Sequence, residues 1–248
     1  MNAPRLYLLD VEGTVAPISL VTEVLFPYAR ERLSAFLSEH AADASVQGDL
    51  ALLAVENRGE SDSNCPQILG APGPSVGTWD NTNRSQADAL AYLNWLMDHD
   101  RKSTALKSLQ GKIWKAGFES GELKGMLFAD VPAALTRWSA EGRVAIYSSG
   151  SVEAQGLLFR HSNYGDLTPL IAAYFDTRTG PKTLPASYAA IAATMNVEPG
   201  EVLFFSDVVR ELDAAREAGF RTRLVVRPGN APVDNALVHA LIHSFEEL

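Results

Sequence analysis

Four short apolar runs, each ending in polar residues, constrain the fold of this chain more than any other feature of its sequence. They cover residues 6–10, 144–149, 202–207 and 224–226. Runs that are apolar throughout, rather than at alternate positions, are typical of parallel strands covered on both faces. The sequence therefore predicts a mostly parallel sheet buried between layers of helices.

Helical patterns lie between the predicted strands, and glycines follow two of them. The patterns cover residues 133–140, 187–195 and 209–218. Gly142 and Gly219 come just after the first and the last, where a left-handed residue that ends a helix is expected. Strand, helix and strand in this order predict a doubly wound α/β fold, in which ligands bind at the carboxyl ends of the strands.

The stretch from about residue 22 to residue 124 interrupts this alternation and has the periodicity of helices. Apolar residues recur there at three- and four-residue spacing, over residues 23–40, 86–97 and 104–118. We expect residues 22–124 to form a helical cap domain, inserted after the first strand of an α/β core made of residues 1–21 and 125–248.

Residues 57–84, inside the expected cap, are rich in Gly, Pro, Ser and Asn. Such a composition predicts a long surface loop between two helices. Nothing in its residues indicates a role for this loop.

The charge balance and the single cysteine exclude several classes of protein. Among 248 residues, 30 are acidic and 21 basic, which gives a net charge of −9. Non-specific nucleic-acid binding needs a basic surface, so we expect no nucleic-acid partner. Cys65 is the only cysteine, which rules out an internal disulfide and a cysteine zinc cluster. No apolar run reaches the roughly 18 residues of a membrane span, so we expect a cytoplasmic protein without a membrane partner. No large apolar surface can be identified from the sequence, so we expect a monomer.

Two acidic residues follow the first predicted strand, in the segment Asp10-Val11-Glu12-Gly13-Thr14. Side chains two positions apart on an extended segment point the same way, so Asp10 and Glu12 are expected to share one site. Like charges held close together raise one another's pKa, and a bound hard cation offsets that cost. Because Mg²⁺ prefers carboxylate oxygens together with water and phosphate, the pair predicts a magnesium site. The alternative is an acidic loop that is merely solvated.

Asp207 ends the third apolar run, and Glu211 follows it one helical turn later. Asp207 is a candidate to complete the metal site, and Glu211 is a candidate to support it through a contact with a ligand. The alternative is that Asp207 caps the following helix, because an Asp there satisfies free backbone N–H groups.

Ser148 and Ser149 end the second apolar run and precede a glycine and a further serine. Hydroxyls and backbone amides between a strand and a helix can cradle a phosphate, which makes both serines candidate substrate-binding residues. Lys182 follows a turn ahead of the helix at 187–195, where its charge could neutralise phosphate. The alternatives are an ordinary serine cap and a solvated surface lysine.

An Asp after the first strand, a Ser after the second, a Lys before a helix and an Asp after the third strand resemble the pattern of the haloacid dehalogenase superfamily. Longer segments narrow the resemblance to one family, the enolase-phosphatases, also called acireductone synthases. These segments are 9–14 with 17–18, 25–28, 100–107, 146–155 and 225–230. The similarity extends from residue 5 to about residue 232, apart from residues 57–84.

Enolase-phosphatases act in methionine salvage, where they convert 2,3-diketo-5-methylthiopentyl-1-phosphate to an enol phosphate and then, by hydrolysis, to an acireductone. The resemblance implies the same two steps here, with a small phosphorylated diketone as partner and Mg²⁺ as cofactor. One alternative is a capped phosphatase of the same superfamily that lacks the enolase step. Another is a non-catalytic binding module that keeps the fold.

The resemblance also implies a role for each candidate residue. Asp10, Glu12 and Asp207 correspond to the Mg²⁺ site, and Ser148, Ser149 and Lys182 to substrate binding. Asp10 is the expected nucleophile, and Lys182 is expected to stabilise charge on the phosphoryl oxygens. Glu12 replaces the aspartate that most of the superfamily has at this position, and we expect it to take part in enolisation.

Overall fold

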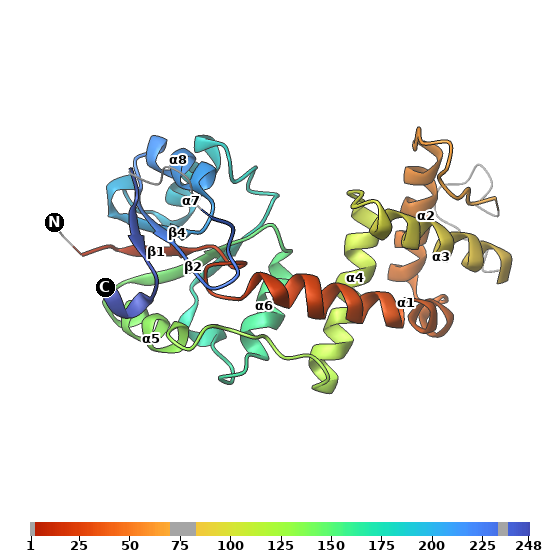
Figure 1. The fold of residues 1–248 in the computed structure, drawn as a ribbon, viewed down its shortest axis with the longest axis horizontal. Coiled ribbons are helices and arrows are strands. Elements are labelled where there is room, and N and C mark those ends of the chain that lie inside the picture. Colours follow the sequence, from red (N-terminus) through yellow and green to blue (C-terminus); the bar gives the residue numbers. More distant parts are fainter. Residues whose placement is uncertain (1–2, 70–82, 233–237) are drawn as a thin grey trace. The chain divides into compact units, whose positions relative to one another are not determined.

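The computed structural model describes residues 3–69, 83–232 and 238–248. The chain divides into two compact units, a core unit and a helical unit. The core unit comprises Met1–Glu23 and Phe118–Leu248, and the helical unit comprises Val24–Gly117. Figure 1 labels the helices and strands of both.

Within the described residues, the core unit contains a six-stranded parallel sheet with the order β3-β2-β1-β4-β5-β6. The strands are β1 Leu6–Leu9, β2 Arg143–Tyr147, β3 Ala173–Phe175, β4 Val202–Ser206, β5 Arg221–Val225 and β6 Ala240–Ile242. The doubly wound fold is confirmed, and a strand occurs at each of the four predicted runs, although β5 begins three residues before the run predicted at 224–226 and ends one residue before its end. The sequence does not predict β3 and β6, because each has three residues and is partly exposed, so no continuous apolar run marks it.

Helices cover both faces of the sheet (Figure 1). They are α5 Val131–Glu141, α6 Val152–Arg160, α7 Pro185–Met195 and α8 Val209–Glu217. Leu6 and Leu8 of β1 belong to the apolar cluster that α7 and α8 form on one face. Tyr7 points to the other face and stacks on Trp138 of α5, with 4.9 Å between ring centroids. Strand β1 is therefore buried on both sides, as its apolar sequence predicts.

The two glycines that follow helices differ in conformation. Gly219 has a φ of 91° and is left-handed, as predicted. The prediction for Gly142 is wrong, because its φ of −161° is extended backbone that leads directly into β2.

Strand β1 lies between β2 and β4, so the order of the strands reverses there. In doubly wound sheets, ligand sites form at the carboxyl ends of the strands around such a reversal. The residues that follow β1, β2 and β4 are Asp10, Ser148 and Asp207.

The helical unit packs its helices around an apolar core. They are α1 Phe26–His40, α2 Ala44–Arg58, α3 Asn83–Asp98 and most of α4 Thr104–Ser120, and a π-helical segment, Leu20–Leu25, precedes α1. Each contributes a buried leucine to one cluster, namely Leu33, Leu50, Leu93 and Leu109. No helix in the described part of the chain is long and apolar enough to cross a membrane.

Helix α2 and the limits of the loop differ from the predictions. The sequence does not predict α2, because apolar residues such as Leu52 and Val55 occupy its exposed side and obscure the periodicity. The loop predicted over residues 57–84 is wrong at both ends, where residues 57–58 continue α2 and residues 83–84 begin α3. Residues 59–69 form neither helix nor strand, and residues 70–82 lie outside the described part.

Candidate active site

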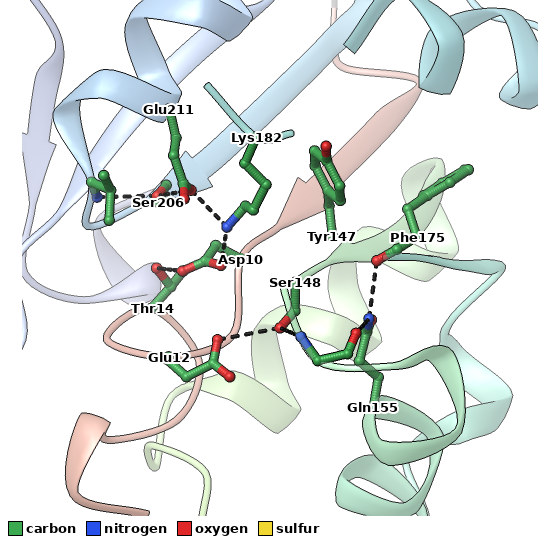
Figure 2. Close-up of polar contacts among 12 residues, drawn as sticks. Asp10, Glu12, Thr14, Tyr147, Ser148, Gln155, Phe175, Lys182, Ser206 and Glu211 are labelled. Atoms are coloured by element: carbon green, nitrogen blue, oxygen red, sulfur yellow. Dashed lines mark hydrogen bonds and ion pairs between the residues drawn. The ribbon is translucent and has the colours of Figure 1, made fainter. Parts of the chain in front are cut away.

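Asp10 comes directly after β1 and is 3% exposed. Its backbone N–H donates to the carbonyl oxygen of Phe205 in β4 at 3.0 Å, which continues the sheet to the end of the strand. Thr14 Oγ1 donates to Asp10 Oδ2 at 3.2 Å, and Lys182 Nζ forms an ion pair with Asp10 Oδ1 (Figure 2). Both oxygens of the carboxylate are held, so its orientation in the site is defined.

The Lys182 side chain is 11% exposed and lies between two carboxylates. Besides Asp10, its Nζ pairs with Glu211 Oε2 at 2.6 Å. The backbone of Lys182 is also held in place, because Tyr188 donates its hydroxyl to the Lys182 carbonyl at 2.7 Å. Burial alone would lower the pKa of Lys182, but the charges of Asp10 and Glu211 outweigh it and raise the pKa. Lys182 is a buried cation, and the alternative of a solvated surface lysine is wrong.

Glu211 lies in the first turn of α8 and holds Lys182 in place. Ser206 donates its hydroxyl to Glu211 Oε2 at 2.9 Å, the same oxygen that pairs with Lys182. Burial raises the pKa of Glu211, and the charge of Lys182 opposes that rise. The structure thus places Glu211 against the lysine.

Asp207 follows β4 and packs against the loop after Asp10. A Cβ atom added to Gly13 would lie 2.3 Å from Asp207 Oδ2, so the carboxylate fills the space that a larger residue would need. Burial raises the pKa of Asp207 to about 7, with further contributions from the charges of Asp10 and Glu211. Helix α8 is capped at Val208 without a side-chain hydrogen bond, so the alternative that Asp207 caps it is wrong.

Glu12 reaches the carboxyl end of β2. Ser148 donates its hydroxyl to Glu12 Oε2 at 3.2 Å and accepts the backbone N–H of Gly150 at 3.0 Å. Burial raises the pKa of Glu12, and the nearby charge of Asp10 raises it further. The loop after β1 and the loop after β2 therefore meet through this contact (Figure 2).

The serines after β2 have different environments. Ser148 is buried, whereas Ser149 beside it is exposed. Ser151 caps α6, where its hydroxyl accepts the backbone N–H of Ala154 at 3.2 Å. The serine-cap alternative is thus correct for Ser151, while the hydroxyl of Ser148 faces Glu12.

The structure brings the predicted residues together at the carboxyl edge of the sheet. Figure 2 shows five of them, Asp10, Glu12, Ser148, Lys182 and Glu211. Asp207 lies beside Gly13 in the loop after β1. Ser149 follows Ser148 in the chain and is exposed, and its role in the site stays a prediction. Sequence reasoning missed Thr14 and Ser206, whose hydroxyls bind Asp10 and Glu211. Thr14 belongs to the segment that identified the site, and its spacing of four residues from Asp10 is the signal that could have found it.

The acidic residues of the site offer oxygen ligands for a divalent cation. In residues 3–69, 83–232 and 238–248, no group of three or more Asp, Glu, His or Cys side chains is arranged to hold a metal ion. Asp10 and Asp207 remain as a pair of hard oxygen donors whose repulsion contributes to the raised pKa of Asp207. Mg²⁺ is usually bound through one or two carboxylates and keeps waters and substrate phosphate as its other ligands. The pair therefore fits Mg²⁺, while the role of Glu12 as a ligand stays a prediction.

Comparison with known proteins places the chain in a family. The family model for haloacid dehalogenase-like hydrolases matches residues 4–219. Enolase-phosphatase E1 of Synechococcus elongatus is 52% identical over 242 residues, which cover 97% of this chain and 96% of that protein. Enolase-phosphatase E1 of Sorangium cellulosum is 45% identical over 245 residues, covering 98% of this chain and 97% of that protein.

Solved structures agree with this assignment. The UTR4 protein of Saccharomyces cerevisiae is similar with a TM-score of 0.77 and 35% identity, over 99% of this chain and 100% of that one. CbbY from Rhodobacter sphaeroides in complex with phosphate has a TM-score of 0.56 at 19% identity, over 99% of this chain and 96% of that one, which shows a likeness of fold. The chain therefore belongs to the haloacid dehalogenase-like hydrolases and, among them, to the enolase-phosphatase E1 family.

Proposed function

We propose that this protein is a Mg²⁺-dependent enolase-phosphatase, an acireductone synthase of methionine salvage. It would convert 2,3-diketo-5-methylthiopentyl-1-phosphate to an acireductone and phosphate. The observation that carries the proposal is the buried Asp10 carboxylate, which Lys182 and Thr14 hold at the carboxyl end of β1. The names of relatives that are 42–52% identical over nearly the whole chain support the same activity.

Phosphate release would use Asp10 as the nucleophile. An oxygen of Asp10 attacks phosphorus, the bond between phosphorus and the enol oxygen breaks, and the enol oxygen leaves with the electron pair and takes up a proton. Water then attacks the aspartyl phosphate, which releases phosphate and restores the carboxylate. Lys182 contacts Asp10 and therefore lies where it can stabilise negative charge on the transferred group.

Magnesium would be held by Asp10 and Asp207. Bound there, Mg²⁺ would offset the repulsion between the two carboxylates and neutralise charge on the phosphoryl oxygens. Ser148, with Ser149 beside it, would bind the substrate.

Enolisation would use Glu12. A base removes a proton from the carbon next to a carbonyl, and the carbonyl oxygen receives a proton, so the substrate is isomerised without net gain or loss. A raised pKa brings a carboxyl group closer to the pH at which it can both accept and return a proton. The hydrogen bond from Ser148 fixes the direction in which Glu12 points.

The cap domain of residues 22–124, the monomeric state and the cytoplasmic location stay predictions.

The test supplies the diketo phosphate with Mg²⁺ and follows enol absorbance and phosphate release separately. Asp10→Asn is expected to form the enol phosphate and to release no phosphate, whereas Glu12→Gln is expected to block the appearance of the enol. Glu217→Gln, which removes an exposed carboxylate from α8, is the control for the loss of one charge. Normal enol formation by Glu12→Gln would exclude Glu12 as the base. Phosphate release by the wild type from substrates that cannot enolise, with no enol signal from the diketo phosphate, would instead identify a phosphatase without the enolase step.

A further inference from the structure

Arg227 lies two residues beyond the end of β5, and its side chain is 5% exposed. Its Nε donates to the carbonyl oxygen of Thr14 at 3.1 Å, and its Nη1 donates to Asp130 Oδ2 at 2.8 Å. The guanidinium also lies over the rings of Phe128 and Phe245, at 4.6 and 4.7 Å from their centroids. An arginine packed on two rings and bonded at two nitrogens has little freedom to move, so it is a rigid support for the loop after β1.

Asn230 supports the same loop at the neighbouring residue. Its Nδ2 donates to the carbonyl oxygen of Gly13 at 2.9 Å and to that of Val225, the last residue of β5, at 3.3 Å. One amide group therefore connects the end of β5 to the loop that follows β1. Arg227 and Asn230 together hold two consecutive carbonyl groups of that loop.

The loop connects these contacts to the proposed nucleophile. Thr14, whose carbonyl accepts from Arg227, donates its hydroxyl to Asp10 Oδ2 at 3.2 Å. Gly13, whose carbonyl accepts from Asn230, packs against the carboxylate of Asp207. A shift of the loop would therefore move the hydroxyl that orients Asp10 and the backbone against which Asp207 rests.

We propose that Arg227 and Asn230 are positioning residues, which act on Asp10 through the backbone of Gly13 and Thr14. The proposal rests on the proposed function in one respect, that Asp10 is the nucleophile. Neither residue needs to touch the substrate. Their effect is on the geometry of attack, where a displacement of about 1 Å can lower a rate by about 10²-fold.

Two substitutions test the proposal with different risks to folding. Asn230→Ala removes the donor to Gly13 without leaving a charge unpaired. Arg227→Lys keeps a positive charge for Asp130 but cannot donate to Asp130 and Thr14 in the fork geometry of arginine. In each variant, kcat for phosphate release is expected to fall by about 10- to 100-fold while KM stays near that of the wild type.

Two further substitutions serve as matched controls, one for each residue type. Asn94→Ala removes an asparagine of α3, in the helical unit, whose Nδ2 donates to the carbonyl of Leu90 at 3.0 Å. Arg143→Lys changes an arginine at the first position of β2, at the opposite end of that strand from Ser148, that donates to the carbonyl of Met195. Both controls are expected to retain the kcat of the wild type.

A double-mutant cycle separates positioning from a general loss of stability. If Arg227 acts through Thr14, then Arg227→Lys lowers kcat far less in a Thr14→Val background, which lacks the hydroxyl on Asp10, than in the wild type. Thr14→Ser, which keeps a hydroxyl, is expected to restore the full effect of Arg227→Lys. Additive effects, or an equal loss of kcat in the control variants, would overturn the proposal.

Hydrogen–deuterium exchange of a peptide covering residues 10–16 gives a readout that does not depend on activity. Its amides at positions 13–16 bond within the loop, to the carbonyls of Val11 and Ala16. Faster exchange there in Asn230→Ala, but not in Asn94→Ala, is expected. If the wild type turns over no substrate and this difference is still seen, the proposed function fails and the support of the loop stands. Unchanged exchange in both Asn230→Ala and Arg227→Lys would overturn the positioning role, whatever the activity.

Discussion

Gly13→Ala is the smallest change that should disturb the site, because it adds a single methyl group. Gly13 has a φ of 75°, in the left-handed region that residues with a side chain rarely adopt. The added Cβ would lie 2.3 Å from Asp207 Oδ2 and 2.7 Å from Asp207 Cγ. The substitution therefore combines a backbone penalty with a steric clash against a proposed metal ligand.

The magnitude follows from these two effects. Left-handed backbone costs a residue with a Cβ about 1–2 kcal/mol, and overpacking a filled space costs about 1–3 kcal/mol. The free energy of unfolding should thus fall by about 2–5 kcal/mol. Ordinary contact begins near 3.4 Å, so the carboxylate of Asp207 must withdraw by roughly 1 Å. A displacement of that size at reacting groups lowers the rate by about 10²-fold.

Gly121→Ala provides the matched control. Gly121 has a φ of 80°, but no atom lies within 4 Å of the position of its Cβ. This variant should show the backbone penalty alone and should keep its activity. Urea unfolding would measure the loss of stability in each variant, and phosphate release at saturating substrate and Mg²⁺ would measure kcat.

Comparison of Gly13→Ala with Gly121→Ala shows whether the contact between Gly13 and Asp207 matters for stability and activity. If Gly13→Ala were no less stable than Gly121→Ala and kept the kcat of the wild type, the contact between Gly13 and Asp207 would not matter for the site. A loss of stability without loss of kcat would show that Asp207 tolerates the displacement, which contradicts its role as a positioned ligand.

Three further outcomes are expected. Lys182→Met removes the cation beside the nucleophile, so phosphate release should fall by about 10²- to 10³-fold; a rate within tenfold of the wild type would contradict its role. Mg²⁺ should raise the melting temperature of the wild type in a thermal-shift titration but not that of Asp207→Asn, and equal shifts would place the ion elsewhere. Burial opposes the charged form of Asp130, but hydrogen bonds, those from Arg227 foremost, outweigh it and hold its pKa below the usual value of about 3.9. The ionised Asp130 carboxylate therefore stabilises the folded protein above about pH 4, and this contribution is lost as the pH falls through the lower pKa of the folded state. The difference in free energy of unfolding between the wild type and Asp130→Asn, measured by urea unfolding, should shrink in acid.

The central strands could be predicted from the sequence because burial on both faces requires an apolar residue at nearly every position. Strand β1 is covered on both faces, so each of its residues is apolar. Strand β6 lies at the edge of the sheet, and two of its three residues are exposed. The position of β6 depends on backbone hydrogen bonds with β5. Such hydrogen bonds do not require particular side chains, so the sequence contains no pattern that predicts them.

The same distinction separates the parts of the site that could be predicted from those that could not. Taken singly, Asp10 and Lys182 left a solvated loop and a solvated surface lysine open as alternatives. Their combination with the other residues that resemble the superfamily pattern is what predicted a site. Their ion pair joins positions 172 residues apart, and only the folded chain brings them together. Arg227 and Asn230 bind carbonyl groups, and every residue has a carbonyl, so no partner residue type marks their targets in the sequence.

The buried carboxylates of the site lower the stability of the folded protein, because their charges are only partly compensated. Burial raises the pKa of Glu12, Asp207 and Glu211, which means that the folded protein disfavours their charged forms. Lys182 offsets this only in part, because its ammonium pairs with Asp10 and Glu211 and does not reach the other two as an ion-pair partner. Buried carboxylates that are paired incompletely lower stability compared with apolar residues of similar size. Perturbed pKa values of this kind cluster at functional sites, and a divalent cation at Asp207 would remove the part of the penalty that Lys182 leaves.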